Sequence, residues 1–187
     1  MVEQTDDQPN AAPRTFRACG PCTLCCKLML VPELDKPAGK WCQHCAKGVG
    51  CTIRAERPQG CADFQCVWTF AETLDERWRP DRCKFVLRAG IVSEMIIEVD
   101  ASIPDAWRRE PYYAQIKAWS TRGAAPPHLL VMVRDRGRLL VVFPEGEIDL
   151  GPEQPDMRLD TGYEHRGGRL QPFARYEAAD APPLLDV

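Results

Sequence analysis

The amino-acid sequence predicts an α+β fold in which a cysteine-rich, loop-dominated region packs on a small, mainly antiparallel sheet with two or three helices. Three observations lead to this prediction. Nine of the ten cysteines lie between residues 19 and 66, in a stretch repeatedly interrupted by glycine and proline. Residues 64–79 and 104–120 carry apolar side chains at helical spacing. Residues 129–143 consist of two apolar, β-branched arms around a turn, the pattern of an antiparallel hairpin.

Composition limits the classes of protein to consider. The 187 residues are 44% hydrophobic and 27% charged, which is typical of a globular protein. A net charge of −3 provides no overall field that would draw the chain onto nucleic acid or a membrane surface. The first 17 residues have no apolar signal core, and no run is long enough for a membrane helix. We therefore expect a cytoplasmic protein with reduced thiols, no nucleic-acid or membrane partner, and at most an unidentified protein partner.

The chain is predicted to have four parts. Residues 1–15 are polar and form a disordered tail, and residues 179–187 form a frayed end. Residues 16–79 form the cysteine-rich, metal- or cluster-binding region, which ends in a closing helix over 64–79. Residues 80–178 form the α+β region. Because residues 16–66 contain few apolar side chains, that region needs a staple other than a hydrophobic core.

The α+β region contains recognisable elements. Strands are predicted at residues 85–87 and 95–99, which are apolar and β-branched. A helix is predicted to begin at Pro111, because proline suits a first helical position. Residues 123–127 are predicted to be a linker or turn.

Two hairpins are predicted in the last third of the chain. The stronger one occupies residues 129–143, with its turn at residues 135–137. The weaker one pairs residues 157–163 with residues 169–176 around Gly167 and Gly168.

The first cysteines have the spacing of a cluster-binding loop. Cys19-x2-Cys22-x2-Cys25 matches the first three ligand positions of the bacterial ferredoxin run. The adjacent Cys26 should diverge from Cys25, because neighbouring side chains point apart in a helix or a strand. Cys26 is therefore expected to reach a second site, or to complete the first one from an irregular backbone.

The later cysteines supply a second complement of ligands. Cys42-x2-Cys45 is another metal-binding pair, and Cys45, Cys51, Cys61 and Cys66 together amount to four sulfurs. The number of thiols suits one site with spare cysteines, or two sites. Four-thiolate zinc uses such pairs as readily as an iron–sulfur cluster, so the spacing does not select the metal.

The candidate ligands follow from this spacing. Cys83 is expected to be a small buried apolar side chain, and His44 a solvent-facing loop residue. No nucleotide-binding or hydrolase motif is present, so no catalytic residue is predicted. The predicted metal ligands are Cys19, Cys22, Cys25, Cys26, Cys45, Cys51, Cys61 and Cys66, with Cys42 as a further candidate.

Residues 16–70 resemble the zinc- or iron-chelating CxxCxxCC domain family of bacteria. The resemblance begins with the run from Cys19 to Cys26 and continues through Cys45, Cys51 and the Cys61–Cys66 segment. It implies that these cysteines chelate metal. One branch of the family is linked to flagellin lysine methylation, but residues 80–187 contain no adenosylmethionine fingerprint, so methylation is not carried over.

The sequence thus predicts a cytosolic metal-binding protein with a cysteine-ligated iron–sulfur cluster or zinc and a redox or accessory role. One alternative is a protein-interaction module built around structural zinc. A second alternative is a metal- or cluster-dependent enzyme whose substrate the sequence does not indicate.

Overall fold

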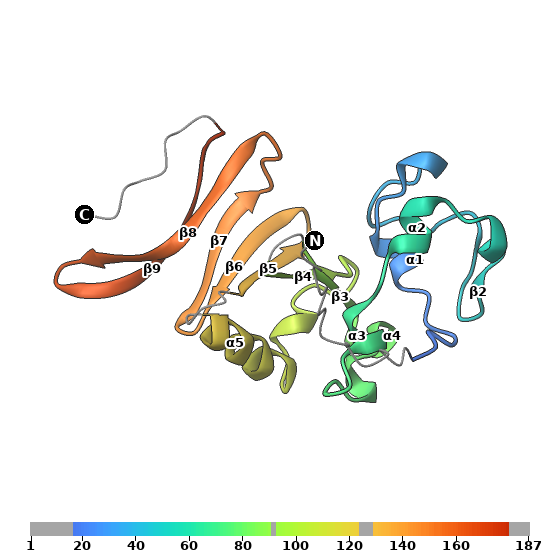
Figure 1. Ribbon diagram of the computed structural model, residues 1–187, viewed down its shortest axis with the longest axis horizontal. Coiled ribbons are helices and arrows are strands. Elements are labelled where there is room, and N and C mark those ends of the chain that lie inside the picture. The colour runs from blue at the N-terminus through green and yellow to red at the C-terminus, as the bar shows by residue number, and fades with distance from the viewer. Residues whose placement is uncertain (1–16, 91–92, 124–128, 180–187) are drawn as a thin grey trace, which may run out of the picture.

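The cysteine-rich residues and the main sheet form two lobes. The computed structural model describes residues 17–90, 93–123 and 129–179. In Figure 1 the cysteine lobe (residues 17–66) lies at one end, the main sheet in the middle and a long hairpin at the other end. The predicted tail at 1–15, the end at 180–187 and residues 124–127 of the predicted linker lie outside the described residues.

The main sheet is mixed but mostly antiparallel. Its strand order is β3–β4–β5–β6–β7, and only the β4–β5 pair is parallel. A parallel pair needs a crossover, and this one contains α5 (Tyr112–Gly123), which begins one residue after the predicted start at Pro111. The predicted α+β class is confirmed. The strands are β3 (Phe85–Ala89), β4 (Glu94–Val99), β5 (Leu130–Asp135), β6 (Arg138–Phe143) and β7 (Gly146–Pro152).

Both predicted hairpins are confirmed. β5 and β6 are joined by Arg136 and Gly137 with φ of 53° and 73°, so the turn is one residue shorter than predicted. Two left-handed residues in succession match the twist of the flanking strands. The second hairpin, β8 (Met157–Arg166) and β9 (Arg169–Ala178), turns at Gly167 and Gly168 in the same way.

The two faces of the sheet bury different partners. One face, with Phe85, Ile97 and Val133, belongs to a core that includes Ile116 of α5 and Leu24 of the cysteine lobe. The opposite face belongs to a second core, and its partly buried members include side chains of the β8–β9 hairpin. Each large aliphatic side chain buried in this way contributes about 1.5–3 kcal/mol.

The predicted single helix over residues 64–79 is wrong. The structure has α3 (Val67–Phe70), a turn and a 3-10 helix, η3 (Glu76–Trp78). The Arg17 guanidinium donates to the carbonyl oxygens of Ala71, Glu72 and Leu74, and the indole of Trp68 donates to Asp75 O at 3.0 Å. Side chains therefore donate hydrogen bonds to carbonyl oxygens that, in a continuous helix, would accept hydrogen bonds from backbone N–H groups. Trp68 and Trp78 are still buried, as the apolar spacing indicated.

The cysteine lobe consists of short elements, as its glycines and prolines predict. An ion pair between Lys27 and Asp100 connects it to the end of β4. No helix within the described ranges is long and apolar enough to cross a membrane. The elements of this lobe are α1 (Cys25–Leu28), η1 (Pro32–Leu34), β1 (Cys45–Ala46), β2 (Gly50–Cys51), η2 (Arg54–Glu56) and α2 (Gln59–Asp63). Outside the lobe, beyond η3, lie α4 (Pro80–Cys83) and η4 (Ala106–Arg108).

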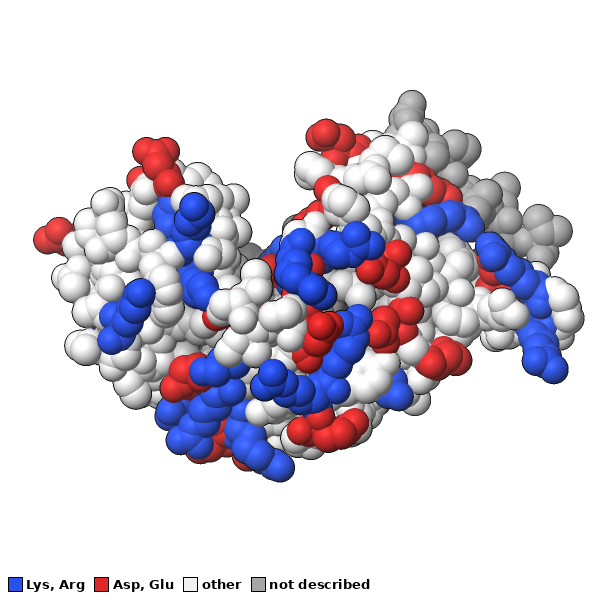
Figure 2. Space-filling model, turned by 180° about the vertical axis from the view of Figure 1, so that it is seen from behind, with Lys and Arg blue, Asp and Glu red and all other residues white. Residues whose placement is uncertain are grey.

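Charge is distributed differently over the two lobes. Figure 2 shows basic and acidic side chains interleaved over the sheet region, whereas the cysteine lobe at the left is largely uncharged on this face. Much of the interleaving comes from ion pairs across strands, such as Arg88 and Arg134 with Glu98.

Candidate metal centre

The cysteines separate into two groups in space. All ten are free thiols. The first, called the pocket group, faces the sheet lobe, and the second, called the loop group, lies among the short elements of the cysteine lobe. The pocket group is Cys19, Cys22, Cys25 and Cys66. The loop group is Cys26, Cys42, Cys45, Cys51 and Cys61.

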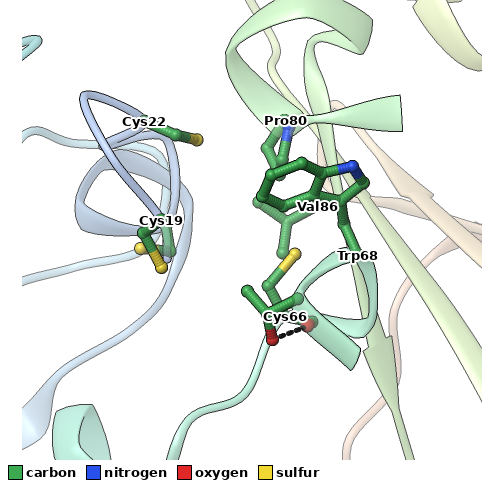
Figure 3. Close-up of a pocket in the computed structure, with 8 residues that line it drawn as sticks. Cys19, Cys22, Cys66, Trp68, Pro80 and Val86 are labelled. Carbon is green, nitrogen blue, oxygen red and sulfur yellow. Dashed lines mark hydrogen bonds between the residues drawn. The ribbon is translucent and has the colours of Figure 1, made fainter. Parts of the chain in front are cut away.

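The pocket group lines a cavity of about 20 Å³ between the two lobes. Figure 3 shows Cys19 and Cys22 on one side of this cavity and Cys66, Trp68 and Val86 on the other. Pro80 and Thr69 complete the lining. Three of its cysteines therefore come from one loop, and the fourth is supplied by a segment some forty residues further along the chain.

Local backbone structure explains how these cysteines are presented. Gly20 has φ of 55°, which allows a tight turn in which the Cys22 N–H donates to Cys19 O at 3.1 Å. Cys66 stands directly before α3, and its carbonyl accepts from the Thr69 hydroxyl at 2.7 Å. Thr69 thus holds the Cys66 backbone in place and also lines the cavity.

Backbone N–H groups point at two sulfurs of the pocket group. Cys22 accepts from the N–H groups of Leu24 and Asp81, and Cys66 accepts from those of Trp68 and Leu87. Burial raises the pKa of Cys22 and raises that of Cys66 to about 11, against the opposing effect of these hydrogen bonds. Both thiols are therefore protonated at neutral pH, and a metal would have to displace the protons. The thiolates would then find hydrogen-bond donors already in position.

Cys26 connects the loop group to the pocket group, because its thiol is within hydrogen-bonding reach of the Cys25 thiol. The thiols of Cys26 and Cys45 are within hydrogen-bonding reach of each other, and the Thr23 hydroxyl donates to Cys45. Cys45 pairs with Cys51 across β1 and β2, and the Cys42 N–H donates to Cys26 O at 2.9 Å.

Cys61, on α2, completes the loop group. It interacts electrostatically with Cys26, Cys42 and Cys51. Burial is the main reason that the pKa of Cys61 is raised and that of Cys45 is raised to about 11.

A buried lysine lies beside the loop group. Lys36 is 5% exposed, and its ammonium donates to the carbonyl oxygens of Lys27, Met29 and Pro37. Burial lowers the pKa of Lys36, while nearby Cys42, Cys26 and Cys61 favour its charged form. Lys36 therefore closes the loop over residues 27–37 and places a positive charge next to several thiols. Nothing in the residue pattern around Lys36 indicated that it would be buried.

The structure revises how the predicted ligands group together. The sequence predicts Cys66 in a second complement with Cys45, Cys51 and Cys61, but Cys66 instead joins the pocket group, because α3 packs against β3 and carries it to the sheet lobe. Cys25 lines the pocket, but the Cys26 thiol is within hydrogen-bonding reach of the Cys25 thiol, so these neighbouring side chains do not diverge as expected.

Cys83 and His44, which are not among the predicted metal ligands, contact groups other than the nine remaining thiols. Cys83 is 2% exposed and donates to Trp78 O and Phe85 O at 3.4 and 3.1 Å. Burial, above all, raises the pKa of the Cys83 thiol to about 12. His44 is only partly exposed, and its ring contacts the Gln43 amide.

Within the ranges that the structure describes, no three Cys, His, Asp or Glu side chains are arranged so that they could hold a metal ion as they stand. The two groups are neighbourhoods of free thiols, and the assignment of ligands stays a prediction.

No family model, curated protein or solved structure matches this chain. The resemblance of residues 16–70 to the CxxCxxCC family therefore also stays a prediction.

Proposed function

We propose that this protein is a cytosolic metal-binding protein whose cysteine thiolates hold an iron–sulfur cluster or zinc, in a redox or accessory role. The observation that carries the proposal is the convergence on one pocket of four thiols from two segments distant in the sequence. A further five thiols gather beside them. Soft thiolates in such numbers are the ligands that zinc and iron–sulfur clusters prefer.

The thin core of the cysteine lobe supports the same proposal. Among residues 17–65, all of which the structure describes, the buried hydrophobic side chains are Leu24, Leu28 and Val31. Three side chains supply too little apolar burial to offset the entropy of ordering such a segment. Metal–thiolate bonds would supply the missing free energy, as they do in small zinc domains.

A second candidate function is a protein-interaction module stabilised by zinc. Large hydrophobic side chains are exposed on the cysteine lobe, with Leu30 62% and Val49 78% exposed. Trp41 is 36% exposed and has the ammonium of Lys47 over its ring. Exposed apolar side chains of this size are typical of docking surfaces when they are contiguous.

Metal and thiol analysis of the same anaerobic preparation would test the proposal. The full chain should contain iron or zinc, and most of its thiols should react with a chromogenic disulfide only after denaturation with a chelator. Nine or ten freely reactive thiols and no metal would contradict the proposal, as would disulfides in protein taken directly from the cytosol.

A further inference from the structure

The β8–β9 hairpin contains no buried residue, although it is the longest pair of strands among the described residues. Each strand has ten residues, all of them half-buried or exposed, whereas β5 and β6 bury most of theirs. Figure 1 shows the hairpin at one end of the molecule, beyond the main sheet. Because a two-stranded hairpin is at best marginally stable in water by itself, a further strand would stabilise it.

We infer that a second copy of this chain supplies the further strand. The two β8 strands would pair antiparallel about a two-fold axis at Thr161, giving a four-stranded sheet in the order β9–β8–β8–β9. This inference goes beyond the proposed metal-binding function and does not depend on it, because it concerns the end of the molecule opposite the cysteine lobe.

The outer edge of β8 has backbone groups available for pairing. Within residues 17–90, 93–123 and 129–179, β9 is the only strand paired with β8, and β7 contacts β9 more extensively than β8. The two-residue loop makes Arg166 and Arg169 opposite neighbours. Residues that flank such a loop exchange both backbone hydrogen bonds, and bonded pairs then alternate along the strands. The N–H and C=O groups of the odd-numbered residues 159–165 therefore point away from β9.

The outer edge of β9 is blocked by a proline. Pro172 lies opposite Tyr163, at a position whose N–H would point away from β8. Proline has no N–H to donate, and edge strands carry it where pairing with other chains is disfavoured. β8 contains no proline, so of the two edges of this hairpin β8 offers the uninterrupted one.

The side chains of β8 are self-complementary when the two-fold axis lies at Thr161. Antiparallel pairing about this axis places each Arg158 opposite Glu164 of the other copy, and symmetry makes the pair occur twice. Leu159 lies opposite Tyr163 in the same way, so apolar side chains also meet. Opposite charges and apolar pairs directly across two strands stabilise a sheet, whereas like charges destabilise it.

Neighbouring registers bring like charges together. An axis at Gly162 would place Arg158 opposite Arg166. It would also place Asp160 opposite Glu164. An axis at Asp160 would place that carboxylate opposite its own copy. The order of charges along β8 therefore favours the axis at Thr161 over both adjacent positions.

The charged face of the hairpin would continue into the second copy. Arg158 pairs with Glu177 at 2.8 Å, and Arg175 pairs with Asp160 at 2.7 Å across the two strands. Glu164 lies 3.7 Å from Arg175. Because these side chains are partly exposed, the new pairs would extend the alternation of charge over four strands without burying an unpaired charge.

The test measures the mass of the full chain in reducing buffer over a wide concentration range by sedimentation and light scattering. The parent should approach twice its mass of 21.1 kDa as its concentration rises. Thr161→Pro removes the outward N–H at the two-fold axis and should weaken self-association at least about ten-fold. Ala174→Pro is the matched control, because Ala174 lies directly opposite Thr161 and its N–H points from the other edge. This control should associate like the parent.

A charge exchange provides a second comparison if Thr161→Pro does not keep the parent's circular dichroism. Arg158→Glu would place carboxylates opposite each other in the two copies and should also weaken self-association. Adding Glu164→Arg to this variant restores opposite charges in the Thr161 register and should recover the association.

Three outcomes would overturn the inference. The first is a parent that stays monomeric at every concentration. The second is equal weakening by Thr161→Pro and Ala174→Pro, which would place the contact elsewhere. The third is a full chain that associates only after residues 180–187 are removed, which would show that this chain's own end occupies the edge of β8.

Discussion

The cysteine lobe and the sheet lobe are stabilised by different means, although they share one core. In the sheet lobe, Phe85, Ile97 and Val133 are completely buried, and neighbouring strands satisfy one another's backbone groups. In residues 17–65 only three hydrophobic side chains are buried, and a lysine is buried with them. The cysteine lobe is thus ordered with few buried apolar side chains of its own, and two of these, Leu24 and Leu28, belong to the core that it shares with the sheet lobe.

The largest effect should follow from removing metal. The proposed function implies that metal binding and folding are coupled in the cysteine lobe, so a chelator should unfold that lobe while the sheet lobe keeps its strands. Proteolysis of the chelated protein should cut between Pro32 and Gly60, and hydrogen exchange should lose protection there first. Equal protease resistance with and without chelator would show that the lobe is stable by itself.

The converse change removes apolar packing from the sheet lobe. Phe85 is 0% exposed, and its ring contacts those of Trp78 and Tyr112 edge-on. Phe85→Ala should lower the free energy of unfolding by about 3–5 kcal/mol in denaturant titrations. Leu170→Ala, at a side chain that is 59% exposed, is the matched control and should change it little. Similar losses in both variants would contradict this account of the core.

A smaller effect is expected where the lobes are joined. Burial would raise the pKa of Asp100, but hydrogen bonds from Lys27 and Ser102 outweigh burial and hold this pKa below its usual range. The stabilisation is therefore present above the carboxyl's unfolded pKa of about 3.9 and is lost as the pH falls below it. Asp100→Asn should cost about 1–3 kcal/mol at pH 7.

The pH dependence distinguishes this ion pair from a surface one. The difference in stability between Asp100→Asn and the parent should shrink below about pH 4. Asp149→Asn, which removes an exposed pair with Arg138, should cost less than about 1 kcal/mol. A difference for Asp100→Asn that stays constant down to pH 2 would rule out the carboxylate as its source.

The smallest effect is expected at Cys83. This thiol donates to two carbonyls inside the core, so we expect it to pack as a small hydrophobic side chain and not to serve as a metal ligand. Cys83→Ala should cost on the order of 1 kcal/mol and leave the metal content unchanged. Loss of metal in this variant would show that Cys83 is a ligand and that the metal site reaches into the sheet lobe.

Prediction from the sequence worked best where residues close together in the chain determine the structure by themselves. The hairpin turn at Arg136 and Gly137 could be predicted because glycine readily adopts the positive φ that such a turn requires, and Gly137 does so. β7 was not predicted, although Ile148 and Leu150 alternate with more polar residues. The helix over 64–79 failed because Arg17, distant in the sequence, binds its carbonyls.

The candidate site was predictable in composition but not in geometry. Spacing selected the cysteines, but the contact between the thiols of Cys25 and Cys26 was not expected. The position of Cys66 could not, because it depends on how α3 packs against β3. Long-range packing likewise decides the burial of Lys36 and the placement of Trp68, Pro80 and Val86 around the pocket group.

Lys27 has a consequence for communication between the lobes. It lies on α1 directly after Cys25 and Cys26, and its ammonium binds Asp100 and Ser102 just beyond β4. If metal binding shifts α1, the shift reaches the sheet through this contact. Such coupling is reciprocal. A ligand that binds at the Asp100–Ser102 turn and favours one position of α1 would change the affinity for metal, and metal would change the affinity for that ligand by the same factor.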